Sequence, residues 1–284
     1  MGTSEREAKA RRLAEIVEEV PPMPQAARKV LEMTRRQSEV AVAELVRVIS
    51  GDQGLTTKVL RTCNSPYFGL RSRVSTLTQA VVLTGVRTVR SLVLLNSLPV
   101  HRKGPPSFEQ TAMWAHSVAA ALAARYLASE LGDEDPEEAF LAGLLHDVGK
   151  LILSMSLGEK YEPPFLAMYN REGGSVEIER AAFGFDHAEV GLQVIRRWNF
   201  PDRMVSAVGN HHADPASLSG LDLLVRAADE LVSHMGVGFR NPLEGSPAGD
   251  GLRRLGLEGG PLDAIRERVW ASLDQETEMF KGAA

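Results

Sequence analysis

Helical periodicity runs through nearly all of this 284-residue chain and constrains its fold more than any other feature. In the segment 40–50, for example, the apolar residues Val42, Leu45, Val46 and Ile49 recur at the spacing of one helix face. No segment shows the sustained alternation of polar and apolar residues that is typical of a half-buried strand. The chain is therefore predicted to be all-α.

Proline and glycine punctuate the helical pattern and indicate how it is divided. Helices are expected over 11–20, 25–33, 40–50, 55–63, 76–83, 87–98, 108–131, 137–145, 177–183, 187–198, 203–211, 221–234 and 262–279, with a long loop over 236–260. The polar, Pro/Gly-rich segment 102–107 is the best candidate boundary. We therefore expect an N-terminal helical-bundle lobe over 1–104, a second helical lobe over 105–240, and a loop with a closing helix over 241–284.

The charge balance disfavours a nucleic-acid partner. The formal net charge is −5 and the sequence pI is about 5.9, so no excess of lysine or arginine marks a nucleic-acid-binding surface. Lys58, Arg61, Arg87 and Arg90 could still line one basic face of the N-terminal helices. Binding of nucleic acid through that face stays open as the weakest of three functional hypotheses, and a strongly salt-dependent affinity would support it.

Cysteine usage and the N-terminal sequence point to the cytoplasm. Cys63 is the single cysteine, so no intramolecular disulfide can form, and its place in a helical pattern predicts a small buried apolar residue. The first residues, 1–7, are polar and charged and lack the apolar core of a signal peptide. No uninterrupted apolar run approaches the roughly 18–20 residues of a membrane span, so no membrane partner is expected.

The strongest local motif is the stretch Gly143 to Lys150, in which an apolar helix ends in His146 and Asp147. An imidazole and a carboxylate on adjacent residues can both reach a metal ion at the flank of the helix. Gly149 permits a turn or a close approach of another backbone segment, and Lys150 adds a cation. A lone His-Asp pair is weak evidence, because it also occurs by chance at helix ends.

Other histidines and aspartates strengthen the case for a metal site. The further candidate ligands are His116, His187, the adjacent pair His211 and His212, and Asp229. Asp229 lies in the largely apolar stretch 221–232, where an unpaired carboxylate is costly, although an ion pair with Arg226 would also satisfy it. His101 and His234 are set aside as surface or helix-end residues. Each residue alone fits a structural role; together they predict a metal site.

This order of residues resembles the HD superfamily of metal-dependent phosphohydrolases, whose signature H…HD…D maps onto His116, His146–Asp147 and Asp229. His187, His211 and His212 resemble the fuller ligand set of the HD-GYP branch, which holds two or three ions, and Lys150 matches that branch's phosphate-contacting lysine. Over roughly residues 15–240 the chain most resembles the HDOD family, the HD-related output domain. The motifs that carry this resemblance are 21–24, 52–55, 60–65, 74–85, 114–117, 142–150, 187–191, 198–201 and 211–212.

The resemblance implies an HD-type second lobe and a bacterial signalling or regulatory role. All seven ligand positions are occupied, so two divalent ions, Fe, Mn or Zn, are the natural expectation. Three departures from the related patterns stand out. The residues 213–220 replace the Gly-Tyr-Pro motif of the HD-GYP branch, Ala112 replaces a glutamate found in trinuclear members, and Gln53 replaces a proline usual in HDOD proteins. Cyclic di-GMP hydrolysis is therefore disfavoured, while other phosphoesters stay open.

Two further functional hypotheses follow from the resemblance. In the first, the protein is a metal-binding regulatory module that acts through a protein partner or a small nucleotide-like ligand. In the second, it is a metal-dependent phosphohydrolase, a phosphodiesterase, whose ions would activate water while Lys150, the one candidate catalytic residue, neutralises charge on the phosphate. The sequence leaves open whether the protein is catalytic.

Overall fold

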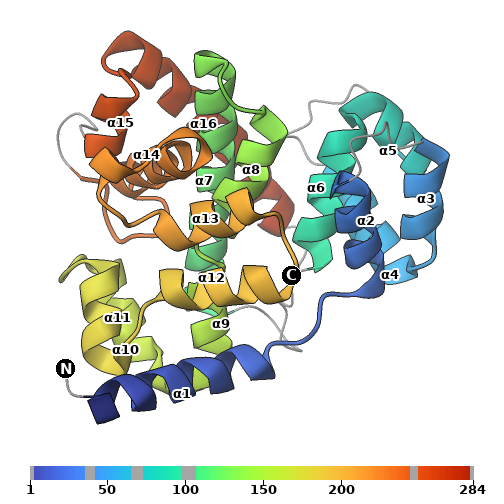
Figure 1. The fold of residues 1–284 in the computed structure, drawn as a ribbon. Helices are drawn as coiled ribbons and strands as arrows, with labels where there is room; N and C mark the ends of the chain where they lie inside the picture. Colours follow the sequence, from blue (N-terminus) through green and yellow to red (C-terminus); the bar gives the residue numbers. More distant parts are fainter. Residues whose placement is uncertain (1–2, 36–41, 65–72, 98–106, 244–248, 282–284) are drawn as a thin grey trace. The chain divides into compact units, whose positions relative to one another are not determined.

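The computed structural model describes residues 3–35, 42–64, 73–97, 107–243 and 249–281, and the regular elements in these ranges are all helices (Figure 1). The all-α prediction is confirmed. The contacts within the chain define two compact units: unit 1 comprises Met1–Pro21 and His101–Arg266, and unit 2 comprises Pro22–Val100 and Glu267–Ala284. The expected division differs from these units at both ends of the chain: the first 21 residues belong to unit 1, and the expected C-terminal segment 241–284 is divided between the units after Arg266.

Unit 2 is a small helical bundle. Its helices are α2 (Gln25–Arg35), α3 (Val42–Ser50), α4 (Gln53–Cys63), α5 (Leu77–Thr84), α6 (Val86–Ser97) and the part of α16 (Gly260–Lys281) that begins at Glu267. Its core includes the fully buried Val30, Leu45, Ile49, Val59 and Val89. This burial explains the helical periodicity of the sequence, because each helix turns its apolar face to the others.

Local polar contacts fix the helix ends of unit 2. Asp52 caps α4 by accepting a hydrogen bond from the Leu55 N–H, and Thr76 forms a capping box with Gln79 at the start of α5. After α4 the Asn64 amide donates to Val74 O and accepts from Val74 N, both at 2.7 Å. Cys63 is buried as predicted, and burial raises the pKa of its thiol to about 11, which keeps the thiol protonated and unreactive.

Unit 1 holds the remaining helices. They are α1 (Thr3–Glu19), α7 (Phe108–Leu131), α8 (Pro136–Leu145), α9 (Val148–Leu157), α10 (Glu162–Tyr169), α11 (Ser175–Phe183), α12 (His187–Arg197), α13 (Asp202–Asn210), α14 (Gly220–Met235), α15 (Asp250–Arg254) and the first residues of α16 (Gly260–Lys281), with the short 3-10 helices η2 (Gly158–Lys160) and η3 (Pro215–Ser217). The helix α1 packs on α9 and α12, and Lys9 pairs with Glu189 at 2.9 Å. This contact places the N-terminal helix in unit 1.

Three of these helices were not expected. The sequence predicted a loop over 236–260, but α15 lies within it, and neither α9 nor α10 was anticipated. The helix α9 buries Leu151, Ile152 and Leu153 in succession, so its apolar residues do not follow the spacing of a single helix face. The helix α10 carries Pro163 and Pro164 in its first turn, where proline is compatible with a helix because those N–H groups need no helical partner.

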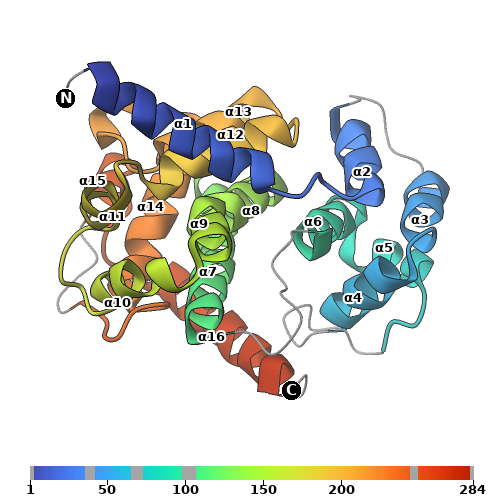
Figure 2. The same ribbon diagram turned by 90° about the horizontal axis from the view of Figure 1, so that it is seen from below.

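The long helix α7 is the centre of unit 1. It packs on α8 and α14, and its buried alanines let the neighbouring backbones come close (Figure 2). A Cβ atom at Gly143 of α8 would lie 2.6 Å from the carbonyl oxygen of Ala120 in α7. The stretch 136–160 is apolar and long enough to cross a membrane by composition, yet 78% of its most apolar 18 residues are buried inside the protein, as in a core helix.

A second close backbone approach joins α9 to α12. A Cβ atom at Gly149 would lie 1.9 Å from the carbonyl oxygen of His187 and 2.9 Å from the Gly191 nitrogen. The prediction that Gly149 permits such an approach is confirmed. Because Gly149 follows Asp147 by two residues, this contact brings the His146–Asp147 pair next to the start of α12.

Candidate metal centre

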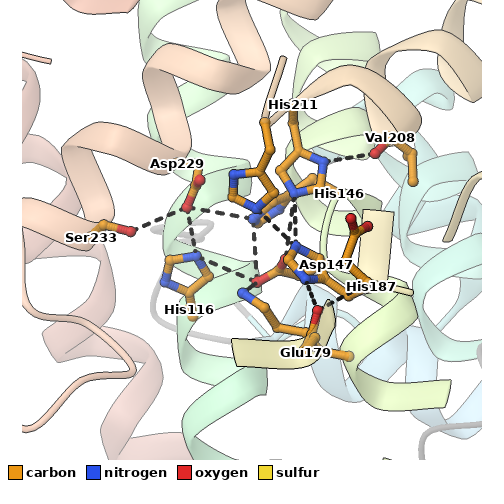
Figure 3. A network of polar contacts seen from close by, with 12 residues as sticks. His116, His146, Asp147, Glu179, His187, Val208, His211, Asp229 and Ser233 are labelled. Atoms are coloured by element: carbon orange, nitrogen blue, oxygen red, sulfur yellow. Dashed lines mark hydrogen bonds and ion pairs between the residues drawn. The ribbon is translucent and has the colours of Figure 1, made fainter. Parts of the chain in front are cut away.

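All seven predicted ligands converge inside unit 1, and six of them are shown close together in Figure 3. They come from the middle of α7 (His116), the junction of α8 and α9 (His146 and Asp147), the first residue of α12 (His187), the end of α13 (His211 and His212) and α14 (Asp229). Six are buried, and His212 is half-buried. The six buried ligands thus lie where the ends of α8, α12 and α13 meet α7 and α14.

The ligand atoms form two groups that share one residue. The His187 group contains Asp147, His187, His211 and His212, and the His116 group contains His116, His146 and Asp147. Within each group, one potential ligand atom per residue lies within 4.8 Å of all the others. Each group therefore offers at least three ligands at a spacing that one metal ion can bridge.

The two carboxylate oxygens of Asp147 face different groups. Its Oδ1 lies 3.2 Å from the His187 Nε2 and 3.7 Å from the His211 Nε2. Its Oδ2 lies 3.5 Å from the His146 Nε2 and 3.7 Å from the His116 Nε2. The Lys150 ammonium, predicted as a nearby cation, pairs with the same Oδ2 at 2.7 Å. This is the geometry of a carboxylate that bridges two ligand groups.

Asp229 adds a second carboxylate beside the His116 group. Its Oδ1 lies 3.1 Å from the His116 Nε2 and 3.8 Å from the His146 Nε2, and it accepts a hydrogen bond from the Ser233 hydroxyl at 3.2 Å. The alternative ion pair with Arg226 does not form, since the Arg226 Nε donates to Glu230 at 2.7 Å. Asp229 therefore faces the site.

Hydrogen bonds orient the imidazole rings alike. The Nδ1 atoms of His116, His146 and His211 contact the backbone carbonyls of Val237, Gly143 and Val208 at 3.0, 2.6 and 2.7 Å. Figure 3 shows the contact between His211 and Val208. Because a carbonyl oxygen only accepts, each Nδ1 must carry a proton and donate it. The Nε2 atoms are thus the ones turned to Asp147, which is the arrangement that metal-ligating histidines adopt.

Two buried atoms of the site lack hydrogen-bond partners among the described residues: the His146 Nε2 and the Asp147 Oδ1. Leaving such polar atoms buried and unsatisfied costs free energy, and a divalent cation in each ligand group would satisfy the one that faces it. The His187 Nε2 also lies only 2.9 Å from the His212 Nε2 and 3.2 Å from the His211 Nε2. The residues present therefore fit a bound metal ion.

Glu179 of α11 is a functional candidate that the sequence did not reveal. It is fully buried, and its Oε2 accepts hydrogen bonds from the His187 Nδ1 at 2.6 Å and the His187 backbone N–H at 2.7 Å. Its Oε1 accepts from the Tyr161 hydroxyl at 2.6 Å. One signal was available: Glu179 shares a helix face with Val176 and Phe183, whereas the exposed Glu177 does not.

The electrostatics of the site keep Asp147, His146 and His212 in the form that metals bind. Burial alone would raise the pKa of Asp147, but His146, Lys150 and His187 outweigh it and lower that pKa well below its usual value. Burial also lowers the pKa of His146 to about 4 and lowers that of His212 well below 6.5. At neutral pH the carboxylate is charged and these two imidazoles are neutral, as metal ligation requires.

Two histidines and one lysine complete the description of the predicted residues. His234 is half-buried in the last turn of α14, apart from both groups, while His101 lies outside the described residues. The carboxylates of Asp147 and Asp229 raise the pKa of Lys150 against the effect of burial, so its ammonium stays charged beside the cluster. Five imidazoles and two carboxylates suit Fe, Mn or Zn.

The comparison with known proteins agrees with this all-helical fold. The sequence model of the HDOD domain matches residues 20–214, and this protein belongs to the HDOD family. A crystal structure of an HDOD domain protein of unknown function from Geobacter sulfurreducens has 25% sequence identity and a TM-score of 0.72, covering 99% of this chain and 98% of that one. The family resemblance inferred from the motifs is confirmed.

Two curated relatives are longer than this chain. An uncharacterized protein of Treponema pallidum (strain Nichols) is 26% identical over 206 residues, which are 71% of this chain and 40% of that protein. Ribonuclease Y of Desulfotalea psychrophila is 34% identical over 116 residues, 41% of this chain and 17% of the enzyme. The chain thus spans well under two thirds of the length of either relative.

Proposed function

We propose that this protein is a regulatory module of the HDOD family built around a centre for two divalent metal ions, and that it acts in the cytoplasm by binding a protein partner or a small nucleotide-like ligand. The observation that carries the proposal is Asp147, whose two oxygens face two separate groups of imidazoles. One ion would be held by the His187 group. The other would be held by the His116 group together with Asp229.

The orientation of the rings supports metal ligation over simple packing. Histidines that only fill a core can present either nitrogen, but here His116, His146, His187 and His211 all place Nδ1 on an acceptor. When bound, the ions would supply Lewis acidity and positive charge. The chain's own part is to orient the rings, keep Asp147 ionised and exclude water from the buried ligand atoms.

The segment that follows His212 supports a regulatory role. HD-GYP enzymes resemble this chain up to the paired histidines but carry their substrate-facing Gly-Tyr-Pro motif beyond them. In this protein the corresponding stretch folds into η3, and the Asp214 carboxylate is used to cap it by accepting from the Ala216 N–H at 2.9 Å. No side chain of that motif is available here for a cyclic dinucleotide.

A second candidate function, metal-dependent phosphodiester hydrolysis, rests on Lys150. Its ammonium lies 2.7 Å from the shared Asp147, and its side chain is 12% exposed, so a phosphate at the centre could contact both the cation and the ions. The similarity to ribonuclease Y makes RNA a reasonable first substrate to try. In this reading Lys150 stabilises charge that develops on the phosphate, while the ions activate water.

Elemental analysis tests the metal centre directly. Protein purified without chelator or metal-affinity resin is expected to contain about two equivalents of Fe, Mn or Zn, and the variants His146→Ala and Asp147→Ala are expected to contain far less. Absence of metal from the native protein, or equal metal in the variants, would contradict the proposal. A single equivalent, lost in both variants, would refute the second ion alone.

A substrate screen separates the two functions. Metal-loaded and chelator-treated protein are incubated with an oligoribonucleotide, a cyclic dinucleotide and a model phosphodiester, beside Lys150→Met and Asp147→Ala. Under the regulatory reading none is hydrolysed by the loaded protein. Hydrolysis that chelation and both variants abolish would establish the second function in place of the first.

A further inference from the structure

The segment Gly236–Leu243, which we call the strap, leaves the end of α14 and lies against His116 of α7. The Val237 carbonyl accepts from the His116 Nδ1 at 3.0 Å. At Gly238, which has a φ of +82°, an added Cβ would lie 2.7 Å from the His116 Cβ and 2.9 Å from the Ala112 carbonyl oxygen. Only glycine at this position lets the strap touch α7 so closely.

An aromatic ring of the strap contacts the imidazole itself. The Phe239 ring stands perpendicular to the His116 ring, at 90° and with centroids 5.6 Å apart. The Arg171 guanidinium lies over the same Phe239 ring, 4.2 Å from its centroid. An edge-to-face pair restrains the tilt of both rings, and the cation restrains the phenyl group from its own side.

Arg171 also ties the strap to the neighbouring helices. Its Nε donates to the Asn241 carbonyl at 3.0 Å, and its guanidinium donates to the Ser233 carbonyl in the last turn of α14. The backbone of Arg240 donates to the Tyr169 carbonyl at 3.0 Å, which joins the strap to the end of α10. One side chain thus contacts the strap backbone, the strap aromatic ring and α14.

The backbone of Arg171 itself is strained. Its φ of +62° lies in the left-handed region, which is unfavourable for a residue other than glycine. Glycine would adopt this conformation without that cost, yet the chain places arginine here. A strained residue whose side chain makes this many specific contacts points to a role for the side chain.

We propose that Arg171 and Phe239 are positioning residues that hold the strap on α7, so that His116 keeps its Nδ1 proton on Val237 and its Nε2 directed at Asp147 and Asp229. The inference rests on the proposed metal centre and adds to it a device that sets the geometry of the His116 group alone. The His187 group has no contact with the strap among the described residues.

Metal competition gives the first test. Apo-protein is titrated with Zn²⁺ against a chromophoric chelator, using Arg171→Gly, Phe239→Leu, the conservative variant Phe239→Tyr, and Arg203→Gln as a control that removes only a surface pair with Glu134 and Glu138. Arg171→Gly relieves the backbone strain while removing the contacts. We expect the affinity for one of the two ions to fall about 10–100-fold in Arg171→Gly and Phe239→Leu, with recovery in Phe239→Tyr.

Nitrogen NMR of the histidine side chains in metal-free protein gives the second test. At alkaline pH, where the His116 ring is neutral, native protein should show His116 protonated at Nδ1, and Arg171→Gly and Phe239→Leu should show a mixture of tautomers. Unchanged His116 signals in both variants would overturn the proposal, as would an equal loss of affinity for both ions. If native protein binds no Zn²⁺, the proposed function fails, and the NMR result still decides whether the strap positions His116.

Discussion

The two ligand groups of this protein share Asp147 but are held in different ways. In the His187 group the ring is oriented by the buried charge of Glu179, a helix residue that also binds the Tyr161 hydroxyl. In the His116 group the ring is oriented by a neutral carbonyl on the strap, whose position depends on Arg171 and Phe239. One group is backed by packed helices and the other by a loop.

This difference gives a physical reason for one cluster to bind two ions with different affinities. A carboxylate on Nδ1 raises the basicity of the imidazole more than a carbonyl does, because it stabilises positive charge on the ring. A loop can also change position at lower cost than packed helices. The His187 group should therefore be the less sensitive to changes at the surface and the more sensitive to changes in the core.

Asp147→Asn should have the largest effect, because it removes the feature that both groups share. We expect both ions to be lost and the unfolding free energy of metal-free protein to fall by about 3–5 kcal/mol, since the Lys150 ammonium loses its ion-pair partner at 2.7 Å. Urea denaturation and elemental analysis measure these effects. Asp222→Asn, on the half-buried start of α14, is the control. If the variant retained metal at the native stoichiometry, Asp147 would not be a carboxylate that both groups share.

Gly149→Ala should disrupt the His187 group and leave the His116 group less affected. Its Cβ would lie 1.9 Å from the His187 carbonyl oxygen, so α9 and α12 must separate, at a cost of about 3 kcal/mol. The His187 group should lose its ion before the His116 group does, as measured by chelator competition. Gly209→Ala is the matched control, because the three atoms nearest its Cβ all belong to the Leu192 side chain, which can shift more easily than a backbone carbonyl. Equal stability of the two variants would contradict the close approach.

Acid should destabilise the metal-free protein from about pH 6.5 downward. Burial lowers the pKa of His146 to about 4, so between pH 6.5 and 4 the unfolded chain binds more protons than the folded one. The stability that neutral His146 contributes is therefore present above pH 6.5 and lost as the pH falls, by on the order of 3 kcal/mol. Urea denaturation across this range measures the slope.

The variant His146→Gln isolates that contribution, because its unfolding free energy should depend less steeply on pH between pH 6.5 and 4 than that of the native protein. His116 should affect the pH dependence of stability in the opposite direction. Burial lowers its pKa, but Asp229 and Asp147 outweigh burial and raise it. The stability that charged His116 contributes is present below pH 6.5 and is lost as the pH rises through its raised pKa. A profile identical in His146→Gln and native protein would show that another group dominates.

Glu179→Gln should have the smallest of these effects and sharpens the comparison most. A glutamine oxygen can accept from fewer donors than the carboxylate, which binds the His187 ring, the His187 N–H and the Tyr161 hydroxyl. The affinity of the His187 group should fall about 10–100-fold while that of the His116 group stays unchanged. Chelator competition is the measurement, with the exposed Glu177→Gln as control. A loss of affinity in the His116 group and none in the His187 group would show that the two affinities had been assigned to the wrong groups.

Much of the candidate site could be predicted from the sequence, since residue type and order carry it. His116, His146, Asp147, His187, His211, His212 and Asp229 were all expected to lie together, and the structure brings them together. Their role as ligands stays a prediction. Glu179 could not be found this way, because a glutamate in an amphipathic helix is usually exposed and its burial follows from how α11 packs on α12.

The helical fold was likewise readable where apolar residues recur at the spacing of one helix face. This period identified α3 and α14, whereas the run of consecutive buried residues Leu151–Ser154 in α9 obscured it. The strap fell inside a predicted loop, and nothing local indicated that Val237 and Phe239 would contact a histidine more than 120 residues earlier.

The sequence by itself determined an all-helical chain, its family and the residues available as ligands, because these depend on residue type, order and local periodicity. Only the tertiary structure decided that the two oxygens of Asp147 face different histidines, that Glu179 supports one group, and that the strap supports the other. The physical reason is that these contacts join segments far apart in the chain, and their distances are set by how whole helices pack.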